Sequence, residues 1–174
     1  MNQLTFKFPF KTNYYEEDFY VSSNNFEAYK LIESWPNWPS RFVNIFGPSG
    51  CGKTHLSTIL KKKLNSFFTI ASELNDNNFI NIKSKECLII DDYNNNIEEK
   101  LLYTVLNQCL QSNQYVIINS IKPIKKIPIE LIDLRSRLES FTDIGIDLPT
   151  DDLIRVILTK SFSDKQVKTD IKLL

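Results

Sequence analysis

The residue types best suited to chemistry lie in one short segment, which reads Gly-Pro-Ser-Gly-Cys-Gly-Lys-Thr and fits the pattern G-x-x-x-x-G-K-[ST] at every fixed position. Glycines let successive backbone N–H groups curl around a phosphate chain. Lys53 would reach the terminal phosphates, and the Thr54 hydroxyl would complete the shell of a bound Mg²⁺. We therefore predict a nucleotide site for ATP or ADP at these residues: Gly47, Pro48, Ser49, Gly50, Cys51, Gly52, Lys53 and Thr54.

Two carboxylates follow the continuous apolar run Cys87–Ile90. A charge at the carboxyl end of a buried parallel strand lies at the edge where open α/β sheets bind ligands. Asp91 suits a contact to Mg²⁺, direct or through water, and Asp92 is placed to polarise an attacking water. The alternative, stronger for Asp92 than for Asp91, is a solvated strand end followed by a polar turn.

Three further positions are candidates for the same site. Val116–Ile118 is another apolar run, followed by Asn119 and Ser120, either of which could orient water beside the γ-phosphate. His55, the only histidine, is expected to line the site by packing rather than by catalysis. Arg137 lies in the segment Leu-Arg-Ser-Arg-Leu of a chain that has only four arginines. A guanidinium delivered to another subunit's γ-phosphate is one use for it, and a surface salt bridge is the other.

Composition limits what kind of protein can carry this site. The chain has 174 residues, about one domain, with 42% hydrophobic residues and a formal net charge of zero. Zero net charge disfavours a globally basic nucleic-acid binder. No apolar run approaches the roughly 18 residues that cross a bilayer, and no secretory signal starts the chain. The three cysteines form no CxxC pair, so we expect reduced thiols and a cytoplasmic protein without a zinc site.

The elements that position these residues alternate between strand and helix. We expect strands at 42–46, 67–71, 87–90, 115–118 and 141–146, and helices at 25–34, 53–64, 97–111 and 129–138. The Asn-rich segment 75–85 reads as loop with at most one edge strand. The alternation predicts a three-layer α/β fold with a five-stranded parallel sheet. We expect an irregular arm over 1–25, the core over 26–148, and the start of a truncated helical lid over 149–174, where Thr150 would cap a helix.

The ordered set GPSGCGKTHL, CLIIDD, VIINS and LRSRL resembles the AAA+ ATPase domain of the DnaA family of bacterial replication initiators. The resemblance covers nearly the whole chain. It implies a P-loop NTPase fold, with Asp91 and Asp92 as the second nucleotide motif, Asn119-Ser120 as the first sensor and Arg137 as an arginine finger. It also implies that the segment beginning at Asp18 and Phe19 lines the nucleobase pocket.

We expect this chain to lack two features of the family's initiators: the C-terminal DNA-binding domain and the N-terminal helicase-contact domain. The resemblance is therefore strongest to the Hda-type regulatory members, which act with the sliding clamp to make DnaA hydrolyse its ATP. Gln3, Leu4, Phe6 and Phe8 resemble the clamp-binding peptide of that group, with a polar head and apolar anchors. The alternative is an N-terminal segment that tucks its aromatic side chains onto the domain.

Three functions follow as hypotheses. The first is a regulator that binds the sliding clamp and presents Arg137 to ATP held by DnaA, with weak or absent DNA binding of its own. The second is the ATPase domain of an initiator or helicase loader assembling on origin DNA. The third, a small-molecule P-loop kinase, needs a lid with several arginines, and arginine is scarce after the sheet. The sequence leaves open whether the chain is itself a weak ATPase and whether it forms homo-oligomers.

Overall fold

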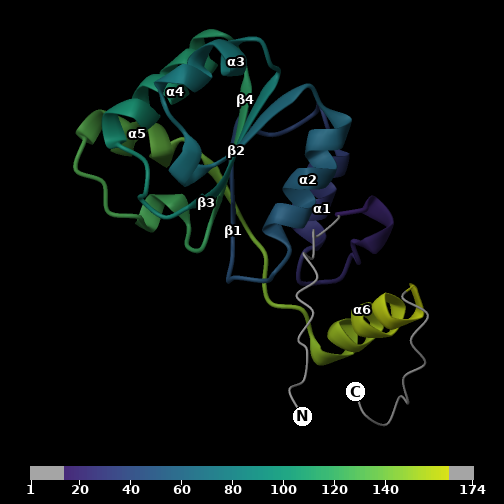
Figure 1. Ribbon diagram of the computed structural model, residues 1–174. Helices are drawn as coiled ribbons and strands as arrows, with labels where there is room; N and C mark the ends of the chain where they lie inside the picture. The colour runs from purple at the N-terminus through teal and green to yellow at the C-terminus, as the bar shows by residue number, and fades with distance from the viewer. Residues whose placement is uncertain (1–13, 165–174) are drawn as a thin grey trace, which may run out of the picture.

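The computed structural model describes residues 14–164, and their side chains as far as Lys160. Five strands form one parallel sheet in the order β2-β3-β4-β1-β5 (Figure 1). Their bounds are Phe42–Phe46 for β1, Ser66–Ile70 for β2, Cys87–Tyr93 for β3, Tyr115–Ser120 for β4 and Thr142–Gly145 for β5. The predicted five-stranded parallel sheet is confirmed, and β3 and β4 run two to three residues further than the sequence suggested, through the polar residues that end them.

Helices cover both faces of this sheet. Helices α1 and α2 lie on one face and α3, α4 and α5 on the other, while α6 follows the last strand (Figure 1). Their bounds are Phe26–Glu33 for α1, Lys53–Lys63 for α2, Phe79–Lys83 for α3, Glu99–Gln111 for α4, Ile132–Glu139 for α5 and Asp151–Asp164 for α6. The result is a three-layer α/β fold, because each face of the central strands needs its own apolar cover.

Each face of the sheet has its own hydrophobic core. Leu88 and Ile90 of β3 pack against α4 and α5, whereas Cys87 and Ile89 of the same strand pack against α1 and α2. All four side chains are fully buried. Successive side chains of a strand point to opposite faces, so a strand covered on both sides is apolar at every position. This explains why the four-residue apolar run correctly predicted a central strand.

One expected element is wrong. The segment 75–85 holds a short 3₁₀ turn, Asp76–Asn78, and then α3, rather than a loop with an edge strand. The side chain of Asn75 caps this turn by accepting a hydrogen bond from the backbone N–H of Asn77. Ile82 is buried beneath α3 in the core on that face. Helix α3 has five residues and a single buried side chain, which is too little to give a helical period in the sequence. Gln108 and Gln114 donate hydrogen bonds to the carbonyl oxygens of Phe79 and Ile82 and thereby hold the helix in place.

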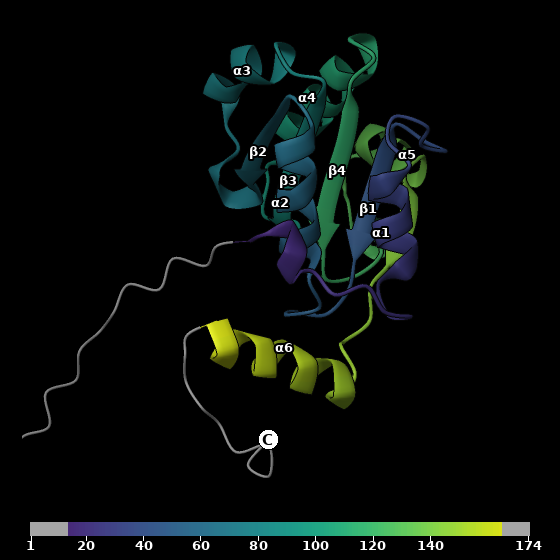
Figure 2. The same cartoon turned by 90° about the vertical axis from the view of Figure 1, so that its right-hand side faces the viewer.

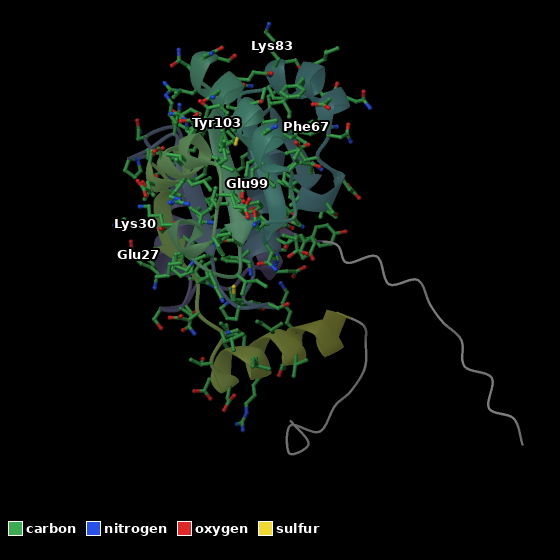
Figure 3. All side chains as sticks on the ribbon, turned by 90° about the vertical axis from the view of Figure 1, so that its left-hand side faces the viewer. Glu27, Lys30, Phe67, Lys83, Glu99 and Tyr103 are labelled. Carbon is green, nitrogen blue, oxygen red and sulfur yellow. The ribbon has the colours of Figure 1, made fainter. Side chains whose placement is uncertain are left out.

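Side chains also join neighbouring helices. The Glu99 carboxylate, at the start of α4, accepts the backbone N–H groups of Glu130 and Leu131 just before α5 (Figure 3). A side chain also caps the start of α6. The Thr150 hydroxyl accepts a hydrogen bond from the backbone N–H of Leu153, as expected for the N-cap of this helix. None of the helices within residues 14–164 is long and apolar enough to span a lipid bilayer.

Candidate functional site

The phosphate loop lies between β1 and α2, at the carboxyl edge of the sheet (Figure 2). Gly50 and Gly52 have φ angles of 82° and 106°, the left-handed region that glycine adopts without strain. Gly52 is the N-cap of α2, and within the described part of the chain no side chain caps that end of the helix. The first backbone N–H groups of α2 and its positive dipole end are therefore available to an anion.

Lys53 lies folded against the loop. Its side chain is buried, and the ammonium donates hydrogen bonds to the carbonyl oxygens of Gly47 at 2.7 Å and Pro48 at 3.0 Å. Lys53 also lines a cavity of about 400 Å³ at the mouth of the loop. The cavity gathers most of the predicted phosphate-binding residues, and its full lining is Tyr14, Ser49, Gly50, Gly52, Lys53, Thr54, His55, Asp92 and Ile121.

Thr54 and Asp91 meet at the base of this loop. The Thr54 hydroxyl donates a hydrogen bond of 2.8 Å to Oδ2 of Asp91, which is itself 6% exposed. A hydroxyl and a carboxylate side by side are hard oxygen ligands, and Mg²⁺ binds proteins through one or two such groups while phosphates and water supply the rest. Residues 14–164 hold no cluster of three or more His, Cys, Asp and Glu side chains for a metal. The donor set fits a Mg²⁺ bound together with nucleotide.

The two candidate sensor residues have different surroundings. The Asn119 amide donates a 2.8 Å hydrogen bond to Oδ1 of Asp91. Ser120 instead accepts from Asn44 and donates to the carbonyl of Lys122, away from the acidic residue. Of the two, Asn119 is therefore the one joined to the phosphate loop and the acidic strand end.

Asp92 is oriented away from Asp91. Its backbone has a φ of 60°, which is unusual for a residue with a side chain. Asp92 is exposed and lines the cavity at the mouth of the loop. The strand thus places one carboxylate inside against Thr54 and the next one outside, lining the cavity. A water held in the cavity could reach Asp92 while Asp91 stays bound to its two neighbours.

A second, smaller cavity of about 170 Å³ adjoins the loop. Asp18, Phe19 and Tyr20 line it from one side, Gly50, Cys51 and Gly52 from the loop, and Leu153 and Ile157 from α6. Lys160 of α6 forms a 2.7 Å ion pair with Asp18. Figure 2 shows α6 beyond the carboxyl ends of the strands, so this cavity lies between the sheet edge and α6. Asp18 and Phe19 therefore lie beside the phosphate loop, and their expected role at a nucleobase stays a prediction.

His55 separates the two cavities and lines both. Its Nε2 lies 2.7 Å from the carbonyl oxygen of Tyr15, and its ring contacts Tyr14 and Phe19 at centroid distances of 5.1 Å and 5.2 Å. His55 thus packs the segment before α1 onto α2, in agreement with a packing role.

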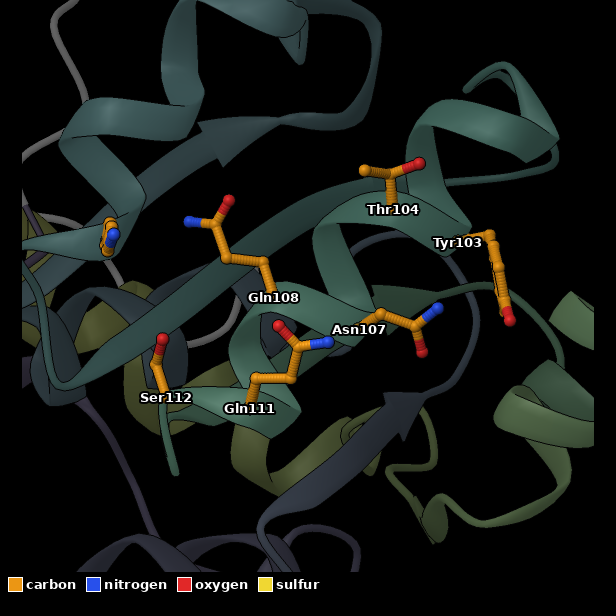
Figure 4. A pocket seen from close by; sticks show the side chains of 7 residues that line it. Tyr103, Thr104, Asn107, Gln108, Gln111 and Ser112 are labelled. Carbon is orange, nitrogen blue, oxygen red and sulfur yellow. The ribbon is translucent and has the colours of Figure 1, made fainter.

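Arg137 lies on α5 and is held by its own chain. Its Nη2 donates a 2.9 Å hydrogen bond to Oδ1 of Asn107 on α4. Asn107 also lines a polar hollow of about 460 Å³ with Tyr103, Gln108 and Lys83 (Figure 4). This hollow has no carboxylate in its lining and none of the predicted nucleotide-binding residues, so we do not regard it as the nucleotide site.

Four predicted residues cannot be placed in the structure, and one residue at the site was not predicted. Gln3, Leu4, Phe6 and Phe8 lie outside the described residues. Ser57 was not predicted, yet its hydroxyl accepts a 2.8 Å hydrogen bond from Asn119. Its position three residues after Thr54, on the same helix face, is the signal in the sequence that could have indicated it.

One family model and several solved structures are similar to this chain. A family model described as RNA helicase matches residues 43–128, which run from β1 through the phosphate loop, the acidic strand end and Asn119. No curated protein sequence matches the chain closely enough to count as a relative.

Solved structures of replication proteins share the fold. A DNA replication initiation factor superposes with a TM-score of 0.75 at 23% identity over 92% of this chain and 58% of the other. Domain III of Thermotoga maritima DnaA superposes with a TM-score of 0.74 at 21% sequence identity, over 94% of this chain and 79% of the other. AMPPCP-bound DnaA from Aquifex aeolicus superposes with a TM-score of 0.69 at 23% sequence identity, over 92% of this chain and 59% of the other. The chain thus spans less than two thirds of the first and third structures, and it shares the three-layer α/β fold of these structures.

Proposed function

We propose that the chain binds ATP or ADP with Mg²⁺ and acts as a nucleotide-dependent AAA+ domain in replication initiation. The observation that carries this is the meeting of Thr54, Asp91 and Asn119, which brings the phosphate loop, β3 and β4 together at one sheet edge. The similarity in fold to DnaA bound to AMPPCP supports the choice of an adenine nucleotide.

Each residue has a role that follows from its place. The loop backbone and Lys53 bind the β- and γ-phosphates, and the bound metal would neutralise their charge. Thr54 and Asp91 would hold that metal, Asp92 would orient water at the γ-phosphate, and Asn119 would hold the Asp91 carboxylate in place. The small cavity beside Phe19 takes the base, because an aromatic wall and a few polar groups suit a flat heterocycle.

The first experiment is calorimetric titration with ATP and ADP in Mg²⁺. Lys53→Ala removes the buried ammonium beside the loop and should weaken ATP binding at least tenfold, since hydrogen bonds to charged groups contribute about 1.5–3 kcal/mol. Lys61→Ala is the matched control, because Lys61 lies on the same helix and contacts the Phe68 ring instead. Equal affinity in all three proteins would contradict nucleotide binding at this loop.

We further propose that the domain regulates the initiator DnaA by presenting Arg137 to ATP held by DnaA, in association with the sliding clamp. Such a guanidinium stabilises the transferring phosphoryl group and can contribute roughly 10³–10⁵ in rate. Asn107 would orient the guanidinium from within the chain. Arg137→Ala should therefore abolish stimulated hydrolysis on DnaA while the domain's own nucleotide affinity stays the same.

The tether to the clamp is tested separately. We expect the chain to bind the sliding clamp through residues 3–8, and the double variant Gln3→Ala/Phe6→Ala should abolish that binding. The opposite result is an intact chain that binds no clamp and binds DNA with an affinity that falls steeply as the salt concentration rises. That result would favour the second hypothesis, the ATPase domain of an initiator or helicase loader.

A further inference from the structure

Four buried or half-buried polar side chains form a connected ring beneath the phosphate loop. Thr54 donates to Oδ2 of Asp91, Asn119 donates to Oδ1 of Asp91, and Asn119 donates again to the hydroxyl of Ser57, each at 2.8 Å. Thr54 and Ser57 are three residues apart on α2, so they lie on the same face of that helix. The hydrogen bonds therefore run from α2 to β3 to β4 and back to α2.

The ring determines how the Asn119 amide is oriented. Each oxygen of the Asp91 carboxylate accepts one hydrogen bond, from Thr54 and from Asn119, so the NH₂ group of Asn119 must face Asp91. Its second N–H then goes to Ser57. A flipped amide would set its carbonyl oxygen against the Asp91 carboxylate, two acceptors facing each other. The Asn119 amide therefore has two acceptors, Asp91 and Ser57, and together they fix its orientation.

Burial makes this contact consequential. Ser57 and Asn119 are fully buried, and Asp91 is 6% exposed, so bulk water cannot readily replace the Ser57 hydroxyl. Within the described residues, the carbonyl oxygen of Asn119 has no hydrogen-bond partner. An amide that loses Ser57 would gain freedom to rotate, and Asp91 would then lose the neighbour that holds one of its two oxygens.

We propose that Ser57 is a positioning residue of the nucleotide site, whose hydroxyl holds the Asn119 amide and through it the Asp91 carboxylate that shares Mg²⁺ with Thr54. This rests on the proposed nucleotide binding. It predicts an effect on the Mg²⁺-dependent part of nucleotide affinity alone, because Lys53, the loop backbone and the base cavity do not belong to the ring.

The test is calorimetric binding of ATP, with Mg²⁺ and with EDTA, to the wild-type chain and to Ser57→Ala. We expect the affinity ratio between the two conditions to fall about fivefold in Ser57→Ala, the size of one lost hydrogen bond, while the affinity in EDTA stays the same. Thr58→Val is the matched control, because the Thr58 hydroxyl donates to the carbonyl of Thr54 within the helix. Ser57→Thr keeps a hydroxyl and should keep the ratio, provided that thermal unfolding without nucleotide shows a folded chain.

A double-mutant cycle shows whether Ser57 acts through Asn119. In the Asn119→Ala background, Ser57→Ala should cause no further change in the ratio. The inference is overturned if the ratio is unchanged in a folded Ser57→Ala, if affinity falls equally in Mg²⁺ and EDTA, or if the two substitutions are additive. A wild-type chain that binds no ATP in either condition would instead contradict the proposed function.

Discussion

Gly47 is a residue at which a missing side chain shapes the site. A Cβ at this position would lie 2.1 Å from the carbonyl oxygen of Ile146 and 2.9 Å from Sγ of Cys51. The backbone of Ile146 cannot move freely, because its N–H donates a 2.8 Å hydrogen bond to the carbonyl of Phe46. The phosphate loop therefore begins where β1 and the end of β5 touch, and only glycine fits there.

Gly47→Ala should accordingly lower the free energy of unfolding by about 2–3 kcal/mol, toward the upper end of the usual range for single substitutions. Gly50→Ala is the control, because a Cβ there meets no heavy atom within 4 Å and only the φ of 82° opposes it. That left-handed backbone should cost about 1–2 kcal/mol. Urea unfolding without nucleotide measures both, and a Gly47→Ala chain at least as stable as Gly50→Ala would contradict the packing argument.

Helix α4 shows how one element covers a sheet face. Leu106 is fully buried in the core between α4 and the sheet, while Leu110, one turn later, is 44% exposed. Leu106→Ala should lower the free energy of unfolding by about 2–5 kcal/mol, since it removes buried methyl groups and leaves a cavity. Leu110→Ala should change it by about 1 kcal/mol at most. Chemical denaturation of the two variants gives the comparison, and equal losses would mean that α4 does not pack as described.

The elements also show what the sequence can and cannot predict. Central strands such as β3 were predicted because burial on both faces leaves a continuous apolar run. Helix α3 was not, since five residues with one buried side chain carry no period. The strand order was not predicted either. It brings β4 between β3 and β1, and this long-range pairing cannot be read from local spacing.

The site was predicted to the extent that its motifs are local. The phosphate loop and Asp91 follow from contiguous residues, whereas the choice of Asn119 over Ser120 depended on which side chain meets Asp91 across two strands. Arg137 was singled out for its rarity and family likeness, but its hydrogen bond to Asn107 needed the packing of α5 on α4. The spacing of Ser57 from Thr54 places its side chain on the same face of α2, but its contact with Asn119 depends on how β4 packs against that helix.

At the scale of the whole molecule, the two cores each bury a thiol. Cys109 of α4 lies in one core and Cys87 of β3 in the other, both fully buried. Burial raises the pKa of Cys109 to about 12 and also raises the pKa of Cys87, because a thiolate would lose its hydration. Both cores therefore bind their thiol protons more tightly than the unfolded chain does.

This has a definite sign for stability. Between the ordinary thiol pKa of about 8.5 and the raised values, the unfolded chain loses protons that the folded chain keeps, so the free energy of unfolding falls as pH rises. Each such thiol contributes a slope of about 1.4 kcal/mol per pH unit once the unfolded form is ionised. Urea unfolding at pH 8, 9 and 10 in a reducing buffer should show this decline.

Cys109→Ala separates the slope from the packing. The substitution should lower stability at pH 8, because it removes a buried sulfur, yet the decline between pH 9 and 10 should be shallower by about 1 kcal/mol per pH unit. A variant whose slope equals that of the wild-type chain would show that Cys109 ionises alike in both states. Cys87→Ala should also make the decline shallower, and the two losses of slope are coupled, because burial raises the pKa of Cys87 and the charge of Cys109 raises it further.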